Sequence, residues 1–261
     1  MTGRAGLVIA VLVAVLAGAL PVMGKPKVRY QQGWAGRPWA RHAAMSGPQC
    51  LAELERRGVR AVRAPAEGAQ GVMAPVRLPE GAGRVMYRTA APAHVRARQP
   101  GDVMDCRMAL SLAEFSKVLR AHGVVEVQMA SAYRPARALG TQGARGVQGA
   151  RGGQGGAVLE GLGLRHAGGL AVDVLRFGKE GGKGALVWLD VEHDFGGTLG
   201  APVCGAGQEG LAGAAKALRA LICEAAARHL FTSILTPNYD RAHKNHVHLE
   251  VTPGVQWELL R

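Results

Sequence analysis

Residues 246–251 read His-Val-His-Leu-Glu-Val, in which polar and apolar side chains alternate strictly. This alternation predicts a β-strand that places His246, His248 and Glu250 on one face and directs its valine and leucine side chains into a core. A further histidine, His243, precedes His246 by three residues. The segment therefore predicts a sheet that carries several histidines on its polar face.

A second stretch, residues 171–177, reads Ala-Val-Asp-Val-Leu-Arg-Phe and also predicts a strand. In a regular strand Asp173 shares its face with Phe177 and the other odd-numbered residues. A carboxylate among apolar neighbours is costly unless its charge is compensated, and a metal ion can do this. Gly168 and Gly169, just before the strand, permit a tight turn or a close approach of the backbone.

Together the two stretches supply the residue types that bind zinc. A catalytic zinc site takes three protein ligands from His and Asp or Glu and keeps one position open for water. His166, Asp173 and His248 are the candidate ligands of Zn²⁺, and His246 and His243 remain to move protons beside the metal. Judged by spacing alone, the alternative is a pair of exposed strand histidines without a metal.

Glu192, His193 and Asp194 form a rival cluster of metal-binding residue types. They follow an expected strand at 186–191, where they can cap a turn, bind Ca²⁺ weakly or simply be solvated, and we favour the solvated state. The sequence has no His-Glu-x2-His motif, no Gly-x-Ser-x-Gly motif and no phosphate-binding Gly-rich loop. Chemistry based on a Ser or Cys nucleophile therefore has no support in the sequence.

Helix and strand patterns are mixed without a regular β-α-β alternation, which predicts an α+β fold with a central, mainly antiparallel sheet and flanking helices. Asp105 is the expected N-cap of a helix that runs to His122, with large apolar side chains on one face and Gly123 at its end. A second amphipathic helix is expected over 208–230. Further strands are expected at 59–63, 72–78, 84–89, 124–133 and 231–236.

The first residues are typical of a targeting segment. Arg4 precedes an almost wholly apolar run, and small residues that suit cleavage follow, so 1–24 are expected to be a signal peptide. The alternative is an uncleaved anchor, because the run approaches the roughly 18 residues that can span a bilayer. After the signal we expect a basic, Pro- and Gly-rich linker at 25–47, the domain at 48–253 and a tail at 254–261.

Glycine recurs at every third position from Gly140 to Gly155. The period is that of collagen, but triplets without proline do not sustain a triple helix. We therefore expect 136–161 to be a flexible loop inserted between Arg134 and His166. It acts either as a lid or glycan contact at the site, or it is the product of replication slippage in a tolerant loop.

The chain carries a formal charge of +13 and four cysteines. Expected export, and basic residues that are scattered rather than interleaved with aromatics, argue against nucleic acid as the partner. An anionic cell-envelope polymer or a phosphate-bearing lipid surface fits better, and an Arg-rich composition without a specific partner is the alternative. An oxidising compartment favours two disulfides. Of the three possible connectivities we favour Cys50–Cys106 and Cys204–Cys223, which pair each half of the chain with itself.

Several motifs occur in an order found in one group of zinc enzymes: His166-Ala-Gly-Gly-Leu-Ala-Val-Asp173, Ser131-x-Tyr133-Arg134 and His246-Val-His248 among them. Over roughly residues 48–252 the chain resembles the bacterial extensin-like C-terminal family. That family is related to penicillin-insensitive murein endopeptidases and D-alanyl-D-alanine peptidases, in the lysostaphin and hedgehog-like group. The resemblance implies the fold of the hedgehog-like and D-Ala-D-Ala zinc peptidases.

The resemblance also implies roles for particular residues. His166, Asp173 and His248 hold the zinc, while His246 and His243 assist catalysis. The sequence departs from the family pattern at Leu164, where a Ser is usual, and in lacking a Cys between Tyr133 and Arg134. Both departures bear on the substrate more than on the metal.

Around the implied metal, Arg134 is expected to contact a substrate carboxylate or the oxyanion, with Tyr133 and Ser131 also binding substrate. Glu250 is expected to orient a zinc-bound histidine from outside the ligand set. The expected function is an exported zinc metallopeptidase, periplasmic or extracellular, that hydrolyses a peptide amide in peptidoglycan through a zinc-bound water. The alternative is a non-catalytic, zinc-stabilised module that binds the cell envelope.

Overall fold

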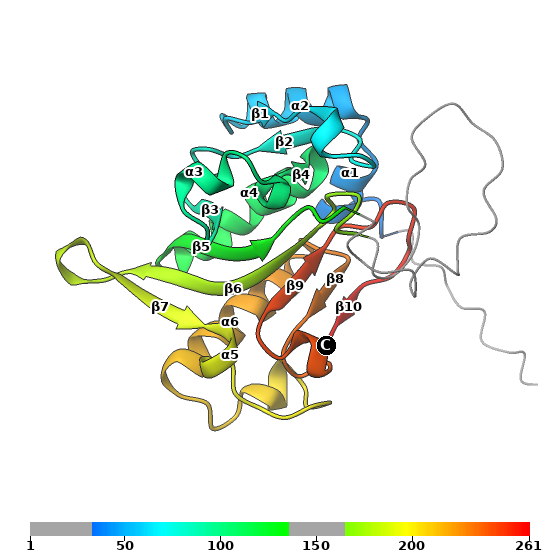
Figure 1. Cartoon of the computed structure of the whole chain (residues 1–261). Coiled ribbons are helices and arrows are strands. Elements are labelled where there is room, and N and C mark those ends of the chain that lie inside the picture. The colour runs from blue at the N-terminus through cyan, green and yellow to red at the C-terminus, as the bar shows by residue number, and fades with distance from the viewer. Residues whose placement is uncertain (1–32, 136–164) are drawn as a thin grey trace, which may run out of the picture. The chain divides into compact units, whose positions relative to one another are not determined.

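Two sheets with helices packed around them make up the part of the chain that the computed structural model describes, residues 33–135 and 165–261. The larger sheet has the order β10-β8-β9-β6-β5-β3, with β7 also paired to β6, and the smaller one has the order β1-β2-β4 (Figure 1). The strands are β1 Val62–Arg63, β2 Pro75–Arg77, β3 Met86–Thr89, β4 Met104–Asp105, β5 Val124–Ser131, β6 Ala171–Glu180, β7 Leu186–Asp190, β8 Ser233–Leu235, β9 Val247–Glu250 and β10 Leu259–Leu260. The helices are α1 Pro38–Ala43, α2 Gly47–Arg56, α3 Ala93–Arg96, α4 Cys106–Ala121, α5 Val191–Asp194 and α6 Gly213–Ala227.

Most pairings in the larger sheet are antiparallel. Strand β6 runs antiparallel to β5, β7 and β9, and β8 runs antiparallel to β9. Only the outer pairs β3–β5 and β8–β10 are parallel. The predicted α+β class and mainly antiparallel sheet are therefore confirmed.

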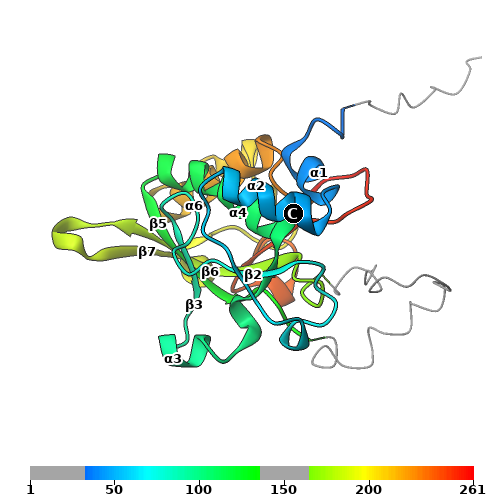
Figure 2. The same cartoon turned by 90° about the horizontal axis from the view of Figure 1, so that it is seen from above.

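Helix α4 forms the centre of the core. The Asp105 side chain accepts a hydrogen bond from the backbone N–H of Arg107 and caps the helix, as its sequence predicts. Gly123, just beyond the helix, has a positive φ of 76°, a conformation that glycine adopts without strain. The predicted apolar face is fully buried, and its Phe115 ring meets the edge of Phe231 at a centroid distance of 5.5 Å. Figure 2 shows α4 and α6 on the same side of strands β5 and β6.

The centre of β6 contains an extra residue relative to its neighbour β5. Val174 lies opposite Met129 and Arg176 lies opposite Gln128, so Leu175 has no partner and the strand bulges. The bulge reverses the alternation of side chains beyond it. Phe177 therefore lies on the helix side of the sheet, where its ring meets Phe115, and the expectation that it shares a face with Asp173 is wrong.

The expected linker at 25–47 is folded in its second half. Residues 38–43 form α1, whose Trp39 is only 1% exposed and whose indole Nε1 donates to Glu258 Oε1 at 2.6 Å. A buried tryptophan with a satisfied N–H contributes to the core, so the domain begins before residue 48. The compact unit runs from Gly33 to Arg261.

The expected tail at 254–261 also belongs to the fold. Leu259 and Leu260 form β10, which pairs in parallel with β8. The backbone N–H of Thr236 donates to the Arg261 carbonyl at 2.7 Å, which extends this pairing to the last residue. Backbone groups that find partners in a sheet are held in place, so this segment is a strand rather than a tail.

Both expected disulfides are confirmed. Cys50 joins Cys106 and Cys204 joins Cys223, with Cα–Cα distances of 6.0 and 5.7 Å. Two disulfides are compatible with an exported protein. Within 33–135 and 165–261, no helix has the length and apolar character to cross a membrane. The expected signal peptide at 1–24 and the expected insertion at 136–161 lie outside the described residues.

Candidate metal centre

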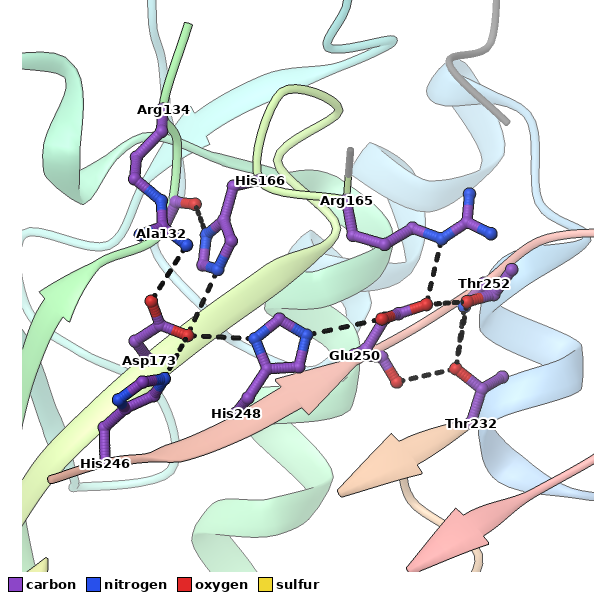
Figure 3. Close-up of polar contacts among 10 residues, drawn as sticks. All are labelled: Ala132, Arg134, Arg165, His166, Asp173, Thr232, His246, His248, Glu250 and Thr252. Carbon is purple, nitrogen blue, oxygen red and sulfur yellow. Dashed lines mark hydrogen bonds and ion pairs between the residues drawn. The ribbon is translucent and has the colours of Figure 1, made fainter. Parts of the chain in front are cut away.

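Three side chains from separate parts of the sequence meet on one face of the larger sheet. Asp173 on β6 lies opposite His248 on β9 in the antiparallel pairing, so their side chains project side by side. His166 reaches the same point from the turn that leads into β6 (Figure 3). One ligand atom from each of His166, Asp173 and His248 lies within 4.8 Å of the others. The structure thus brings together the three residues that the sequence predicts as metal ligands.

The turn at 165–170 sets the position of His166. Its backbone closes on itself, because Gly169 N–H donates to the His166 carbonyl at 3.1 Å and Leu170 N–H donates to Arg165 at 2.9 Å. The imidazole Nδ1 of His166 donates to the Ala132 carbonyl at 2.6 Å, which leaves Nε2 with a lone pair when the ring is neutral. That Nε2 lies 3.1 Å from Asp173 Oδ1. A lone pair this close to a carboxylate oxygen requires a cation between them, either a proton or a metal ion.

His248, like His166, has one ring nitrogen that donates to a protein acceptor. Its Nε2 donates to Glu250 Oε2 at 3.3 Å, and its Nδ1 lies 2.9 Å from Asp173 Oδ1. Each histidine thus has one ring nitrogen fixed by an acceptor and the other directed at Asp173. This is the arrangement of metal-bound histidines, whose outer nitrogen donates to a carboxylate or a carbonyl. Two imidazoles and one carboxylate also form a donor set that suits Zn²⁺.

The electrostatics of the cluster favour an ionised Asp173. Burial alone raises the pKa of this carboxyl, which is 3% exposed, but hydrogen bonds to His166 and His248 outweigh burial and hold the pKa well below its usual range. For His248, burial lowers the pKa, and hydrogen bonds to Asp173 and Glu250 outweigh it and raise the pKa to about 9. The cluster therefore holds a carboxylate that attracts positive charge.

His246 lies beside the three candidate ligands without being one of them. Its Nε2 is 3.5 Å from Asp173 Oδ1, and its Nδ1 is bonded to the Asn245 side-chain oxygen at 2.9 Å. Burial, the largest influence, lowers the pKa of His246 below its ordinary value. A neutral imidazole at the edge of the cluster can accept a proton there.

His243 comes from the short 3₁₀ turn Arg241–His243 and lies beside the cluster. Its Nδ1 donates to Asp240 Oδ1 at 2.7 Å, which fixes the ring. The ring centroid lies 5.1 Å from that of His246 and 5.8 Å from that of His248. Tyr239, 43% exposed, packs against the other side of His243 at 5.5 Å. His243 is thus close to the cluster but outside the ligand set.

Arg134 reaches the cluster from the segment after β5. Its Nη2 lies 3.0 Å from Asp173 Oδ2, and 42% of its side chain is exposed. Its Nε is buried and has no hydrogen-bond partner among residues 33–135 and 165–261. Ser131 lies opposite Asp173 in the β5–β6 pairing and is partly exposed. Arg134 and Ser131 therefore border the cluster.

Tyr133 is placed differently from the sequence prediction. Its side chain packs with Ala69 and Val103 in a small hydrophobic cluster and is 3% exposed. Its hydroxyl donates to the Gln70 carbonyl at 3.1 Å. Successive residues of an extended chain point to opposite sides, so the segment that turns Arg134 toward the site turns Tyr133 away from it. The expected role of Tyr133 in substrate binding is corrected to a role in packing.

Glu250 has the expected place behind His248, and it is itself surrounded by partners that sequence reasoning missed. Arg165 Nε donates to Glu250 Oε1 at 2.9 Å, and the Thr252 hydroxyl donates to the same oxygen. The Thr232 hydroxyl donates to the backbone carbonyl of Glu250 at 2.8 Å. In the sequence, the one feature that could have indicated a role for Arg165 at the site is its position directly before His166.

The rival cluster at 192–194 does not assemble. Within the described ranges, the three-residue group whose ligand atoms converge is the one at His166, Asp173 and His248. His193 is bonded to Asp190, which caps α5, and three quarters of its side chain is exposed. The solvated state favoured for this cluster is consistent with its position.

The comparisons with known proteins agree with these motifs. A family model described as the extensin-like protein C-terminus matches residues 48–261. No curated protein and no solved structure gives a significant match to the chain. Because the family model covers most of the sequence, including all three candidate ligands, this chain belongs to the extensin-like protein C-terminus family.

Proposed function

We propose that this protein is an exported zinc metallopeptidase that hydrolyses a peptide amide in peptidoglycan. One observation carries the proposal: the ligand atoms of His166, Asp173 and His248 converge within 4.8 Å. Each of the two histidines has its other nitrogen held by a protein acceptor, which leaves the inner nitrogen free for an ion. Three protein ligands of these types are the complement of a catalytic rather than a structural zinc.

The residues around the cluster can perform the steps that amide hydrolysis requires. When bound, zinc supplies a Lewis acid that polarises the scissile carbonyl and activates water. His246, at the edge of the cluster, takes a proton from the attacking water and gives one to the leaving nitrogen. Arg134, whose guanidinium is partly exposed, contacts a substrate carboxylate or the developing oxyanion.

The choice of substrate rests on three properties of the chain. Its first residues are typical of a signal peptide, its two disulfides suit an oxidising compartment, and its charge of +13 suits an anionic envelope polymer. The motif resemblance to murein endopeptidases and D-Ala-D-Ala peptidases supports a peptide amide in peptidoglycan. It also supports their common fold as the finer description of this α+β domain.

The second candidate function is a zinc-stabilised module that binds the envelope without catalysis. One observation favours this second candidate. Glu250 has buried hydrogen-bond partners, Arg165 and Thr232, and such a rigid surrounding would also suit a structural metal. Two groups at the edge of the cluster favour the enzyme, since a structural site has no use for His246 or for a partly exposed Arg134.

Digestion of purified peptidoglycan tests the proposal. The exported protein is incubated with sacculi in the presence and absence of a chelator, and the soluble products are identified by mass spectrometry. We expect muropeptides with a newly cleaved amide bond, no products with chelator, and recovery on addition of Zn²⁺. Binding to sacculi without any new products, in protein shown to contain zinc, would establish the binding module instead.

A further inference from the structure

A buried ion pair connects the two segments that carry the histidine ligands. Arg165 directly precedes His166, and Glu250 follows His248 by two residues. Arg165 Nε donates to Glu250 Oε1 at 2.9 Å, and the two residues are 7% and 3% exposed. The pair therefore joins the turn that holds one ligand to the strand that holds the other.

Both oxygens of the Glu250 carboxylate accept hydrogen bonds. One oxygen accepts from Arg165 and from the Thr252 hydroxyl, and the other accepts from His248 Nε2 at 3.3 Å. Thr232, which is fully buried, donates to the Glu250 carbonyl and accepts from the backbone N–H of Thr252 at 3.0 Å. These contacts leave the carboxylate little freedom to rotate (Figure 3).

The physical requirement for Arg165 follows from this burial. A buried carboxylate without a counter-charge is costly, and removing one partner of a buried ion pair destabilises the other. A Glu250 that turned away from His248 would release the imidazole to rotate about its own side-chain bonds. The direction of His248 Nδ1 toward Asp173 thus depends, through Glu250, on the guanidinium of Arg165.

We propose that Arg165 is a positioning residue for the metal centre, acting through Glu250 on the orientation of the ligand His248. The inference rests on the proposed zinc site and deepens it. Arg165 is called a positioning residue because it acts through Glu250, to whose carboxylate its Nε donates. Its loss weakens the hold on the metal even though all three ligands remain.

Metal affinity tests this inference without any assay of activity. Wild-type protein and the variants Arg165→Met, Arg165→Lys and Glu250→Gln are titrated with Zn²⁺ against a competing chelator. We expect Arg165→Met to raise the Kd about 10- to 100-fold, the range typical of partners behind a metal ligand. Arg165→Lys keeps the charge and should recover part of the affinity. The visible absorption of the Co²⁺-loaded variants should change in Arg165→Met and Glu250→Gln, because the His248 ring is reoriented.

Arg88→Met is the control for the loss of an ion pair elsewhere in the same sheet. Arg88 donates to Glu126 at 2.7 Å in an ion pair between β3 and β5, away from the ligand cluster. Its loss should lower the melting temperature but leave the Kd for Zn²⁺ and the Co²⁺ spectrum unchanged. A merely structural role for Arg165 would make Arg165→Met behave like this control.

The outcomes separate the inference from the proposed function. If wild-type protein binds Zn²⁺ and Arg165→Met binds it with the same Kd and Co²⁺ spectrum, the inference alone is overturned. If Arg165→Met does not fold, Glu250→Gln, which keeps the shape of the side chain, decides by the same two measurements. Failure of the wild-type protein to bind Zn²⁺ overturns the proposed function and, with it, the inference.

Discussion

Asp105 and Gly169 are joined by a backbone hydrogen bond of 2.8 Å, from the Asp105 N–H to the Gly169 carbonyl. The N-cap of helix α4 is thereby bonded to the turn between the candidate ligands His166 and Asp173. Gly169 has a positive φ of 65°, and a Cβ atom there would lie 2.6 Å from the Asp105 nitrogen. The contact connects the core helix directly to the candidate metal centre.

Replacing Gly169 by alanine should therefore damage both stability and metal binding. The positive φ alone costs about 1–2 kcal/mol, and the contact with Asp105 adds to this by overpacking, typically about 1–3 kcal/mol. Gly184→Ala is the matched control, because Gly184 also has a positive φ, of 77°, but has open space around it. Urea unfolding and a Zn²⁺ titration of both variants check this. Equal losses in the two variants would contradict the steric argument.

Alanine substitution should separate the candidate metal ligands from the residue proposed to transfer protons. His166→Ala, Asp173→Ala and His248→Ala should each lose the metal, because each removes one of three converging ligand atoms. His246→Ala should keep most of the metal and lose about 100- to 10,000-fold in turnover, the usual cost of a positioned acid–base group. Elemental analysis of the four purified proteins, together with a digestion assay, measures both effects.

Two results would change this ligand assignment. If His246→Ala lost zinc while His248→Ala kept it, the two strand histidines would have exchanged roles. If all four proteins kept zinc, the metal would lie elsewhere, and the cluster at 192–194 would be the next to test.

The buried His42 should make the folded state sensitive to acid. Its ring is 1% exposed, its Nδ1 is bonded to Ser111 Oγ at 2.9 Å, and burial, followed by the charge of Arg57, lowers its pKa to about 4. The unfolded chain binds a proton at about pH 6.5, which the folded chain does not bind until about pH 4. Stability is thus lost as the pH falls through this interval, by about 2–3 kcal/mol between pH 7 and pH 4.5.

The pH dependence is checked by urea unfolding at several pH values. His42→Asn does not titrate, so the difference between wild type and variant isolates this one group from the carboxylates. We expect the variant to lose less stability than the wild type on acidification. The same slope in both proteins would show that His42 does not contribute.

Arg219 should be one of the most stabilising side chains in the C-terminal part. It is 1% exposed, and its guanidinium donates to the carbonyls of Phe195, Gly196, Pro202 and Val203 at 2.6–3.2 Å. Arg219→Met leaves these acceptors without their donor, and each unsatisfied buried group costs about 1–3 kcal/mol. We expect a loss above about 3 kcal/mol in chemical unfolding. Lys216→Met, an exposed change on the same helix, should leave stability almost unaltered.

The features that sequence reasoning predicted are those encoded by local pattern. The alternation at 246–251 placed His248 and Glu250 on one face, and Asp105 at the start of an apolar helix pattern indicated its N-cap. The three residues whose ligand atoms converge were singled out because their residue types are ones that suit zinc, and zinc binding itself stays a prediction. In each case the chemistry of a few neighbouring residues was sufficient.

The features that were missed depend on contacts between distant segments. Trp39 is buried in the hydrophobic core, and its indole N–H finds an acceptor in Glu258, more than two hundred residues later in the sequence. Tyr133 points away from the site because Ala69 and Val103 provide an apolar place for its ring. The partnership of Arg165 with Glu250 likewise forms only once β6 and β9 are paired. The segment around Trp39 was predicted to be a linker because its composition is rich in proline, glycine and basic residues.

The bulge at Leu175 reverses the alternation of side chains between the two halves of strand β6. Before the bulge, Val172 and Val174 face the core while Asp173 faces the candidate metal centre. Beyond the bulge the alternation is reversed, so that Phe177 faces the core. Without the bulge, Asp173 and Phe177 would lie on the same face of a regular strand, because they are four residues apart. Either the Phe177 ring would leave the helices, or Asp173 would leave His248. The bulge therefore lets one strand present Asp173 to the candidate metal centre and Phe177 to the core. Deletion of Leu175 would put these two residues three positions apart, so a regular strand should then keep both on their present faces.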